Sequence, residues 1–297
     1  MRRRSLPLLL LAPLLLATLL LATPHGRAAE IENEAGRLDQ ANAAYWKQDC
    51  DEAAEIWRNL SNEGSAHAQS ILGTMHYTGT CVEQDLERAR DLLWAAASQG
   101  HGRAYANLAT MHYSGTGVPE DLAEAARLYR EAAERNVPSA QGMLATLYMA
   151  GKGVKADPGQ AIAWATRAAE NGHAASQFML GRYWFHGQGV EADPAKAADW
   201  FRLAAEQGHS QAQYYLGMQY ALSKGVDGDL AEAWAWLDAS RRNGFPAAAG
   251  RQQGLEEQLD DAQRKKARAL ARRYADFESL DDTPVIAGED LIRKPRS

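Results

Sequence analysis

The sequence predicts an all-α fold, an α/α solenoid of about six stacked helix pairs, and three observations carry this prediction. Aspartate recurs every 36 residues, alanine recurs four residues after each aspartate, and a glycine column keeps the same step. The columns are Asp49, Asp85, Asp121, Asp157, Asp193 and Asp229, then Ala53, Ala89, Ala125, Ala161, Ala197 and Ala233, then Gly64, Gly100, Gly172, Gly208 and Gly244, with Asn136 at the missing step. A fixed period of this length is the sequence signature of a repeat architecture.

Each repeat predicts a helix-turn-helix unit, as residues 137–172 illustrate. The first helix spans about 139–150, where apolar residues recur at helical spacing. After a glycine-containing loop, Asp157 serves as the N-cap of the second helix, and Pro158 takes the first helical position, where its missing N–H costs nothing. Gly172 ends that helix, because the residue after a helix often adopts a left-handed conformation.

The same columns set the unit boundaries and mark the two ends of the array. The predicted units are about 33–64, 65–100, 101–136, 137–172, 173–208 and 209–244, followed by a cap at 245–276 and a flexible C-terminal tail at 277–297. In the cap we expect one long polar helix, with Asp260–Arg264 and Asp261–Lys265 pairs in the favourable order. A solenoid needs such a polar end for solubility.

Residues 1–29 have the pattern of a secretory signal peptide. Three arginines at 2–4 precede a leucine-rich run at 6–22 and a short polar stretch. Cleavage after Ala28 would leave small residues at the two positions before the cut where signal cleavage requires them. The apolar run is shorter than the ~20 residues that span a bilayer comfortably. We therefore expect a periplasmic or secreted protein with no integral membrane span after cleavage. An uncleaved signal anchor is the alternative.

Composition and charge narrow the class of function. Of 297 residues, 46% are hydrophobic and 24% charged, as in a soluble folded protein, and the net charge is −6. Removing residues 1–29 removes four arginines and no acids, which leaves 28 basic and 38 acidic residues, or −10. An acidic chain of this kind disfavours a nucleic-acid surface.

The repeat motif matches a known family at its packing and turn positions. In the fifth unit the matching residues are Leu180, Gly181, Trp184, Gly187, Gly189, Val190, Asp193, Ala197, Trp200, Phe201, Ala204, Ala205 and Gly208. The pattern resembles the Sel-one-like repeat (SLR) family, a relative of the tetratricopeptide repeats, and the resemblance covers about 33–276. Tetratricopeptide repeats proper have a 34-residue period, so the 36-residue step distinguishes the two.

The resemblance implies a non-catalytic scaffold that binds protein or peptide partners. Secreted bacterial members are similar to adaptors that regulate envelope signalling, assemble envelope machines or bind host proteins. We expect an adaptor of the bacterial cell envelope, with a membrane sensor or an envelope-assembly component as partner and with no cofactor. The alternatives are a secreted host-factor-binding protein and an enzyme acting on cell wall or β-lactam. The dense cysteine pattern of the members linked to β-lactam binding is missing from this chain.

The candidate partner surface is the concave face formed by the first helices of the units. Positions 67, 70, 74 and 77 and their equivalents vary between units and include aromatic, methionine and arginine side chains, which are enriched at interface centres. The candidate residues are Tyr77, Arg103, Tyr113, Met149, Phe178, Arg182, Phe185, Tyr214 and Met218. Packing between neighbouring repeats is the alternative role for each of them.

The two cysteines lie at the same predicted edge of adjacent units. Cys50 follows the N-cap Asp49, and Cys81 occupies the column of Gly117, Gly153, Gly189 and Gly225. In an oxidising compartment this placement favours a Cys50–Cys81 disulfide, which contributes about 3–4 kcal/mol in the chain-entropy model. Two separate, partly buried thiols are the alternative.

The remaining polar residues give no catalytic constellation. His101, His173 and His209 share one repeat column, so neighbours lie about 10 Å apart, whereas zinc ligands converge to about 2 Å from one ion. His76 and His112 replace a motif tyrosine and are expected to pack as rings. The glycine loops precede aspartate N-caps, which repel phosphate. Acidic neighbours make the basic residues of 264–273 a solvated cap face.

Overall fold

The computed structural model describes residues 24–277, with the side chains of residues 33–275 and 277. This part holds fourteen α-helices and one short 3-10 helix, and no strand, which confirms the all-α prediction. The expected signal peptide lies mostly outside the described residues, and so does the expected tail after Phe277. Within the described part, no helix combines the length and the apolar character needed to cross a membrane.

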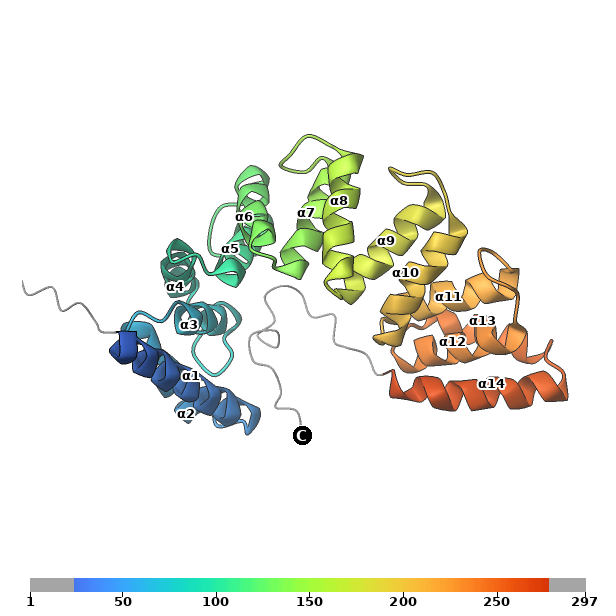
Figure 1. Cartoon of the computed structure of the whole chain (residues 1–297), viewed down its shortest axis with the longest axis horizontal. Coiled ribbons are helices and arrows are strands. Elements are labelled where there is room, and N and C mark those ends of the chain that lie inside the picture. Colours follow the sequence, from blue (N-terminus) through green and yellow to red (C-terminus); the bar gives the residue numbers. More distant parts are fainter. Residues whose placement is uncertain (1–23, 278–297) are drawn as a thin grey trace, which may run out of the picture.

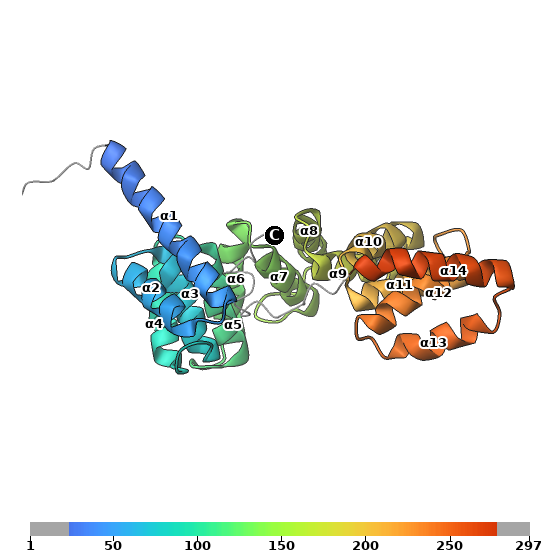
Figure 2. The same cartoon turned by 90° about the horizontal axis from the view of Figure 1, so that it is seen from below.

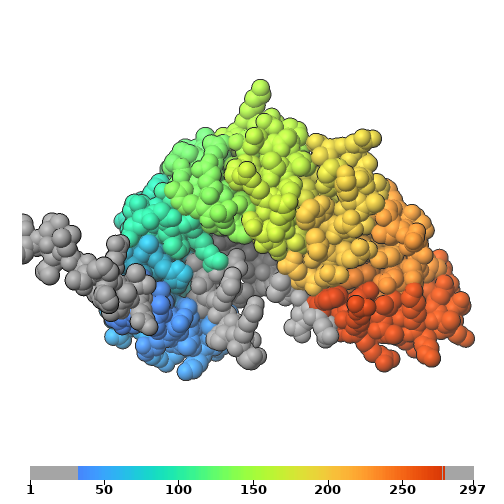
Figure 3. All heavy atoms as spheres, viewed as in Figure 1, coloured from blue at the N-terminus to red at the C-terminus, as the bar shows by residue number. Residues whose placement is uncertain are grey.

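The helices alternate between the first helix of each pair, here called the A helix, and the second, the B helix. The A helices are α1 (Pro24–Trp46), α3 (Ala66–Thr78), α5 (Gly102–Ser114), α7 (Pro138–Ala150), α9 (Ala174–His186) and α11 (Ser210–Leu222). The B helices are α2 (Cys50–Asn62), α4 (Leu86–Ser98), α6 (Leu122–Glu134), α8 (Pro158–Glu170), α10 (Pro194–Glu206) and α12 (Leu230–Arg242). Each helix packs against the next along the chain, and the pairs follow an arch in sequence order (Figures 1 and 3).

Aspartate begins every B helix, as predicted. The carboxylate of Asp157 accepts a 3.0 Å hydrogen bond from the backbone N–H of Gln160, and the equivalent aspartates cap the other five B helices. The backbone N–H of Asp157 also donates to the carbonyl oxygen of Tyr148 at 2.9 Å, which ties the loop to the preceding A helix. Such a cap contributes about 1 kcal/mol. The aspartate column therefore fixes both the start of the B helix and the path of the loop.

The core consists of successive clusters along the array, in which small and large residues meet at the helix contacts. The alanine column is fully buried from Ala53 to Ala233. The inter-unit leucines Leu72, Leu108, Leu144, Leu180 and Leu216 are at most 1% exposed. One helix pair buries too little apolar surface alone, so each unit depends on its neighbours.

The second glycine of each loop lies against the first residue of the preceding B helix. A Cβ atom at Gly153 would lie 1.9 Å from the carbonyl oxygen of Leu122, so only glycine fits there. Cys81 takes this place between the first two units and keeps the left-handed conformation, with φ of 59°. Its partner is Cys50, the first residue of α2, with Cα atoms 4.9 Å apart, which confirms the predicted disulfide.

The C-terminal cap consists of α13 (Ala247–Glu256), α14 (Asp261–Arg273) and the 3-10 helix η1 (Tyr274–Asp276). The expectation of one long helix is wrong, because Asp260 forms a capping box with Gln263 and so begins a new helix. The expected Asp260–Arg264 pair is replaced by contacts from Arg264 to Asp261. Both cap helices pack on α12, and α14 runs along the end of the array (Figure 2).

Candidate functional site

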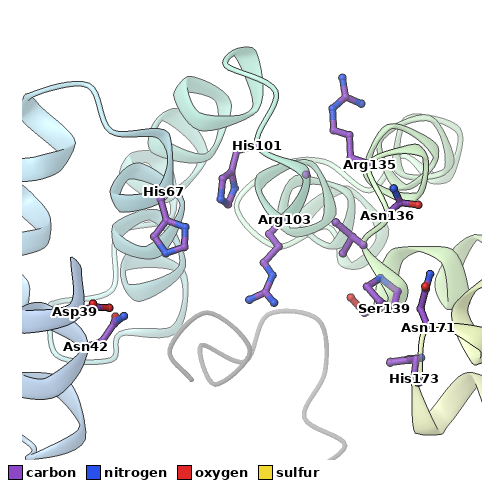
Figure 4. Close-up of a pocket in the computed structure, with 14 residues that line it drawn as sticks. Asp39, Asn42, His67, His101, Arg103, Arg135, Asn136, Ser139, Asn171 and His173 are labelled. Atoms are coloured by element: carbon purple, nitrogen blue, oxygen red, sulfur yellow. The ribbon is translucent and has the colours of Figure 1, made fainter. Parts of the chain in front are cut away.

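A polar hollow of about 880 Å³ lies where the first turns of several A helices meet the ends of the neighbouring B helices. Figure 4 shows its side chains, which come from four consecutive helix pairs and from the start of α9. The residues that line it are Asp39, Asn42, His67, His101, Gly102, Arg103, Arg135, Asn136, Val137, Pro138, Ser139, Asn171, Gly172 and His173. The hollow therefore spans repeats rather than belonging to one of them.

Three of the A helices that reach the hollow start without a side-chain cap. The N-cap residues of α5, α7 and α9 are His101, Val137 and His173, and none accepts a hydrogen bond from a backbone N–H of the helix it precedes. The ring of His173 instead contacts the hydroxyl of Ser176 at 2.8 Å. In contrast, Ser65 and His209 cap α3 and α11. The first N–H groups of a helix carry a partial positive charge. The middle of the array thus turns positive helix ends toward the hollow.

The ionisable side chains of the hollow add to this positive character. Arg103 points into the hollow, whereas Arg135 lies at its rim (Figure 4). The guanidinium of Arg135 lies 4.6 Å from the ring centroid of Tyr105 and forms a 2.7 Å ion pair with Glu131. Asp39 is the acidic residue among the described lining residues, and it is exposed. The positive character of the described lining therefore rests on Arg103 and the uncapped helix starts, which favour groups that carry negative charge.

Two histidines in the hollow are neutral at neutral pH. The rings of His67 and His101 lie 5.6 Å apart in an edge-to-face arrangement. Burial, with smaller contributions from His67 and Arg103, lowers the pKa of His101 to about 4. Burial also lowers the pKa of His67, and Arg103 adds to this effect. Within the described residues, the buried Nδ1 of His101 has no hydrogen-bond partner.

A ladder of side-chain amides runs along the same edge of the solenoid. An amide lies just after four of the six B helices and donates to a glutamine on the A helix of the same unit. The pairs are Gln99 to Gln69 (2.8 Å), Asn171 to Gln141 (3.4 Å), Gln207 to Gln177 (2.7 Å) and Asn243 to Gln213 (3.0 Å). These A-helix glutamines in turn donate to carbonyl oxygens of the preceding B helix, as from Gln177 to Ala169 at 3.0 Å. The ladder therefore joins neighbouring units.

The ladder departs from its pattern at three places. In the first unit Glu63 follows α2 and forms a 2.6 Å ion pair with Arg37. In the third unit the amide pair is replaced by Tyr105 and Arg135, which stack and lie beside the hollow. At the C-terminal end, the amide of Asn243 also donates to the backbone carbonyl oxygen of Phe277 at 2.8 Å. The last rung of the ladder thus binds the backbone of the chain as it leaves the cap.

The candidate partner residues are dispersed by the structure, and only Arg103 among the nine lines the hollow. Tyr77, Tyr113 and Met149 are half-buried and pack against the central core. Phe178 is 8% exposed, and its ring stacks on His209 at 4.6 Å, so inter-repeat packing accounts for it.

The other four candidates lie on α9 and α11. Arg182 is exposed, with its guanidinium 5.9 Å from the ring centroid of Phe178. Phe185 is half-buried beneath the ammonium group of Lys224, and Tyr214 packs against Phe245. Met218 is half-buried. Partner contact by the candidate residues stays a prediction.

Sequence reasoning missed the hollow because it followed the positions that vary along the middle of the A helices. The signal that marks it is at the helix starts, where His101, Val137 and His173 replace capping residues. It also includes Arg135, which replaces an amide.

The ionisable residues of the described part are dispersed or paired with one another. No group of three or more histidine, cysteine, aspartate or glutamate residues in the described part is arranged to hold a metal ion. On α14 the basic residues meet acids: Lys266 pairs with Asp229, and Arg264 and Arg268 both face Glu256. The hollow itself presents N–H donors, amides and arginine, the groups that recognise backbone carbonyls and carboxylates.

Comparison with known proteins gives a consistent result for the fold. The Sel1 repeat family model matches residues 66–101, 102–137, 138–173, 174–209 and 210–245. The chain is similar to the crystal structure of a Sel1 repeat protein from Oxalobacter formigenes, with a TM-score of 0.67 and 26% identity over 83% of this chain and 98% of that one.

It is also similar to c5321, a protective antigen present in uropathogenic Escherichia coli strains that displays an SLR fold. Here the TM-score is 0.51, with 28% identity over 92% of this chain and 67% of that one. No curated protein matches the chain in sequence.

Proposed function

Because the chain belongs to the Sel1 repeat family, whose members generally act in protein–protein interaction, we propose that it is a non-catalytic adaptor of the bacterial cell envelope. It binds an extended segment of a partner protein along the concave face, at the hollow and the amide ladder. The observation that carries this proposal is that the lining of one hollow comes from successive repeats. An extended peptide matches a site of this length.

The chemistry of the lining also favours a peptide over a small substrate. Small-molecule sites are mostly apolar, with a few convergent polar groups. The hollow instead presents polar groups on all its contributing units, among them Asn42, Arg103, Asn136 and Asn171. Such groups pair with the carbonyl and N–H groups that recur along a peptide backbone.

Two features support an extracytoplasmic location for this function. The arginine and leucine pattern of residues 1–29 has the form of a secretory signal. The Cys50–Cys81 disulfide is of the kind that persists in oxidising compartments such as the periplasm. A regulator of a membrane sensor or a component of envelope assembly fits this location.

The experiment that tests the adaptor function is a crosslinking pull-down from the envelope fraction. Wild type is compared with an Arg103→Glu/Ser139→Glu variant, which reverses or adds charge inside the hollow. The matched control is Arg88→Glu, which makes the same type of change at an exposed position on α4. Circular dichroism establishes that both variants keep their helices.

We expect one partner to be captured by wild type and by the Arg88→Glu control but lost from the hollow variant. Like charges brought together at a binding surface cost several kcal/mol, which is enough to abolish capture. Equal capture by both variants would move the interface away from the hollow. Capture of no protein by any of the three would contradict the adaptor function itself.

A further inference from the structure

The described part of the chain ends beside the last pair of the amide ladder. The Asn243 amide that bonds the Gln213 side chain also holds the backbone carbonyl of Phe277. The ring of Phe277 stacks on Trp236, with the two planes only 5° apart, and on Tyr274. These contacts fix the place and the backbone of the residue from which the chain continues. The described part of the chain therefore ends at the last rung.

The sequence that follows is complementary in charge to the hollow. Between 278 and 290 the chain has five carboxylates, Glu278, Asp281, Asp282, Glu289 and Asp290, and no basic residue. The hollow, in turn, presents Arg103 and three helix starts that lack a side-chain cap, with Arg135, ion-paired to Glu131, at its rim. Carboxylates are stabilised both by arginine and by the amino-terminal ends of helices.

The segment also has the length and the conformational bias that this path requires. Three steps of the repeat separate Asn243 from Arg135, which is about 30 Å at ~10 Å per packed helix layer. The thirteen residues from Phe277 to Asp290 (290 − 277) reach about 43 Å when extended. Pro284 and Gly288 disfavour a helix, which would shorten the segment.

We propose that residues 278–290 bind along the amide ladder of their own chain and place Glu289 and Asp290 in the hollow. The proposed path runs in the direction opposite to the repeats. It occupies the surface assigned to the partner, so the regulatory consequence of this proposal rests on the proposed function. A partner gains access by displacing the segment. The adaptor is thereby held in a self-occupied state until a competing peptide is present.

The test uses the purified full chain with no partner, so its result does not depend on the adaptor function. Ser139, which lines the hollow, is replaced by the photoreactive residue p-benzoylphenylalanine, and the control carries the same residue in place of Arg88 on α4. After irradiation, the monomer band is digested and the crosslinked peptides are identified by mass spectrometry. A mixture of isotope-labelled and unlabelled chains distinguishes bonds within a chain from bonds between chains.

The expected result is a crosslink from position 139 to a peptide within 278–297 of the same chain, and none from position 88. A Glu289→Lys/Asp290→Lys variant, altered outside the solenoid, should lower the yield by about tenfold because like charges then meet in the hollow. Removing charge at Arg293 and Lys294 with alanine is the matched change and should leave the yield unaltered.

Three outcomes would overturn the proposal: crosslinks only to other parts of the chain, crosslinks only between chains, or an equal yield from the Glu289→Lys/Asp290→Lys variant. The crosslink within one chain tests the position of the segment, whereas partner capture tests the adaptor function, so the two can fail separately. Persistent capture without an intramolecular crosslink would retain the adaptor and remove the self-occupied state.

Discussion

Removing the Cys50–Cys81 disulfide should destabilise the amino-terminal end of the solenoid selectively. The bond closes a sequence separation of 31 residues. The chain-entropy relation then gives about 3.7 kcal/mol at 25 °C for its contribution to the free energy of unfolding. Because stability in a repeat array is a sum of unit and interface terms, the loss falls on the first units and not on the whole array.

The glycine column supplies a second, opposite effect that can be measured in the same experiment. Cys81 has a φ of 59° at a place where the other units have glycine. A residue with a Cβ atom costs about 1–2 kcal/mol in this left-handed conformation. A Cys50→Ala/Cys81→Gly variant should therefore recover about 1 kcal/mol relative to Cys50→Ala/Cys81→Ala.

Native-state hydrogen exchange measures both effects, since it reports the opening free energy of each helix. In Cys50→Ala/Cys81→Ala, protection of the α2 amides should fall about 500-fold, the factor equivalent to ~3.7 kcal/mol. Protection of α12, at the far end, should be unchanged. Unaltered protection of α2 would refute the stabilising role of the bond. Equal protection in the two double variants would refute the glycine argument.

Three further predictions concern single positions. Gly153→Ala should lower the free energy of unfolding by about 2–5 kcal/mol, since it adds a steric clash to the left-handed conformation. Gly172→Ala, with open space around it, should cost only the ~1–2 kcal/mol of that conformation. Similar losses for the two variants in urea unfolding would count against this distinction. The folded pKa of His101 lies below its unfolded value, so the stability that the neutral ring contributes is present above about pH 6.5 and is lost as the pH falls toward 4. With the partial exposure of the ring, this loss amounts to about 2 kcal/mol. His101→Asn should therefore flatten the pH dependence of the thermal midpoint, and an unchanged slope would contradict this. Gln177→Ala should cost about 1–3 kcal/mol because the carbonyl of Ala169 loses its side-chain donor, and a loss near zero in urea unfolding would show that the ladder does not stabilise the unit contacts.

The repeated part of the fold could be predicted from the sequence because its signals are local. An aspartate N-cap and a glycine or Asn136 after the B helix act within a few residues, and both recur in every unit with the predicted role. The Cys50–Cys81 pair could be predicted because the repeat places two positions that are distant in sequence at the same edge of adjacent units. The division of the cap into two helices could not be predicted, since helical spacing continues across 257–260 and only the Asp260–Gln263 capping box breaks it.

The candidate site was harder to predict because a variable position on a helix has two physical explanations. Phe178 varies because it fills a gap between repeats, where it packs against Phe201 and His209. Arg103 varies because it points into an open hollow. Sequence alone does not separate these cases, since both depend on how far the next helix lies from the side chain.

The location of the hollow follows from a general property of repeat arrays. Residues that build the scaffold are the same in every unit, so a site that exists once must use positions where a unit departs from the pattern. Three such departures are the missing caps of α5 and α7 and the Tyr105–Arg135 pair in place of two amides, and all of them adjoin one hollow. The two missing caps give up a hydrogen bond of the kind that Ser65 supplies to α3, whereas Arg135 replaces an amide bond like Gln207–Gln177 with a contact to Tyr105 and an ion pair with Glu131. Departures that gather in one place support the hollow as the binding site that we propose, and the uncapped helix starts beside it favour an acidic occupant.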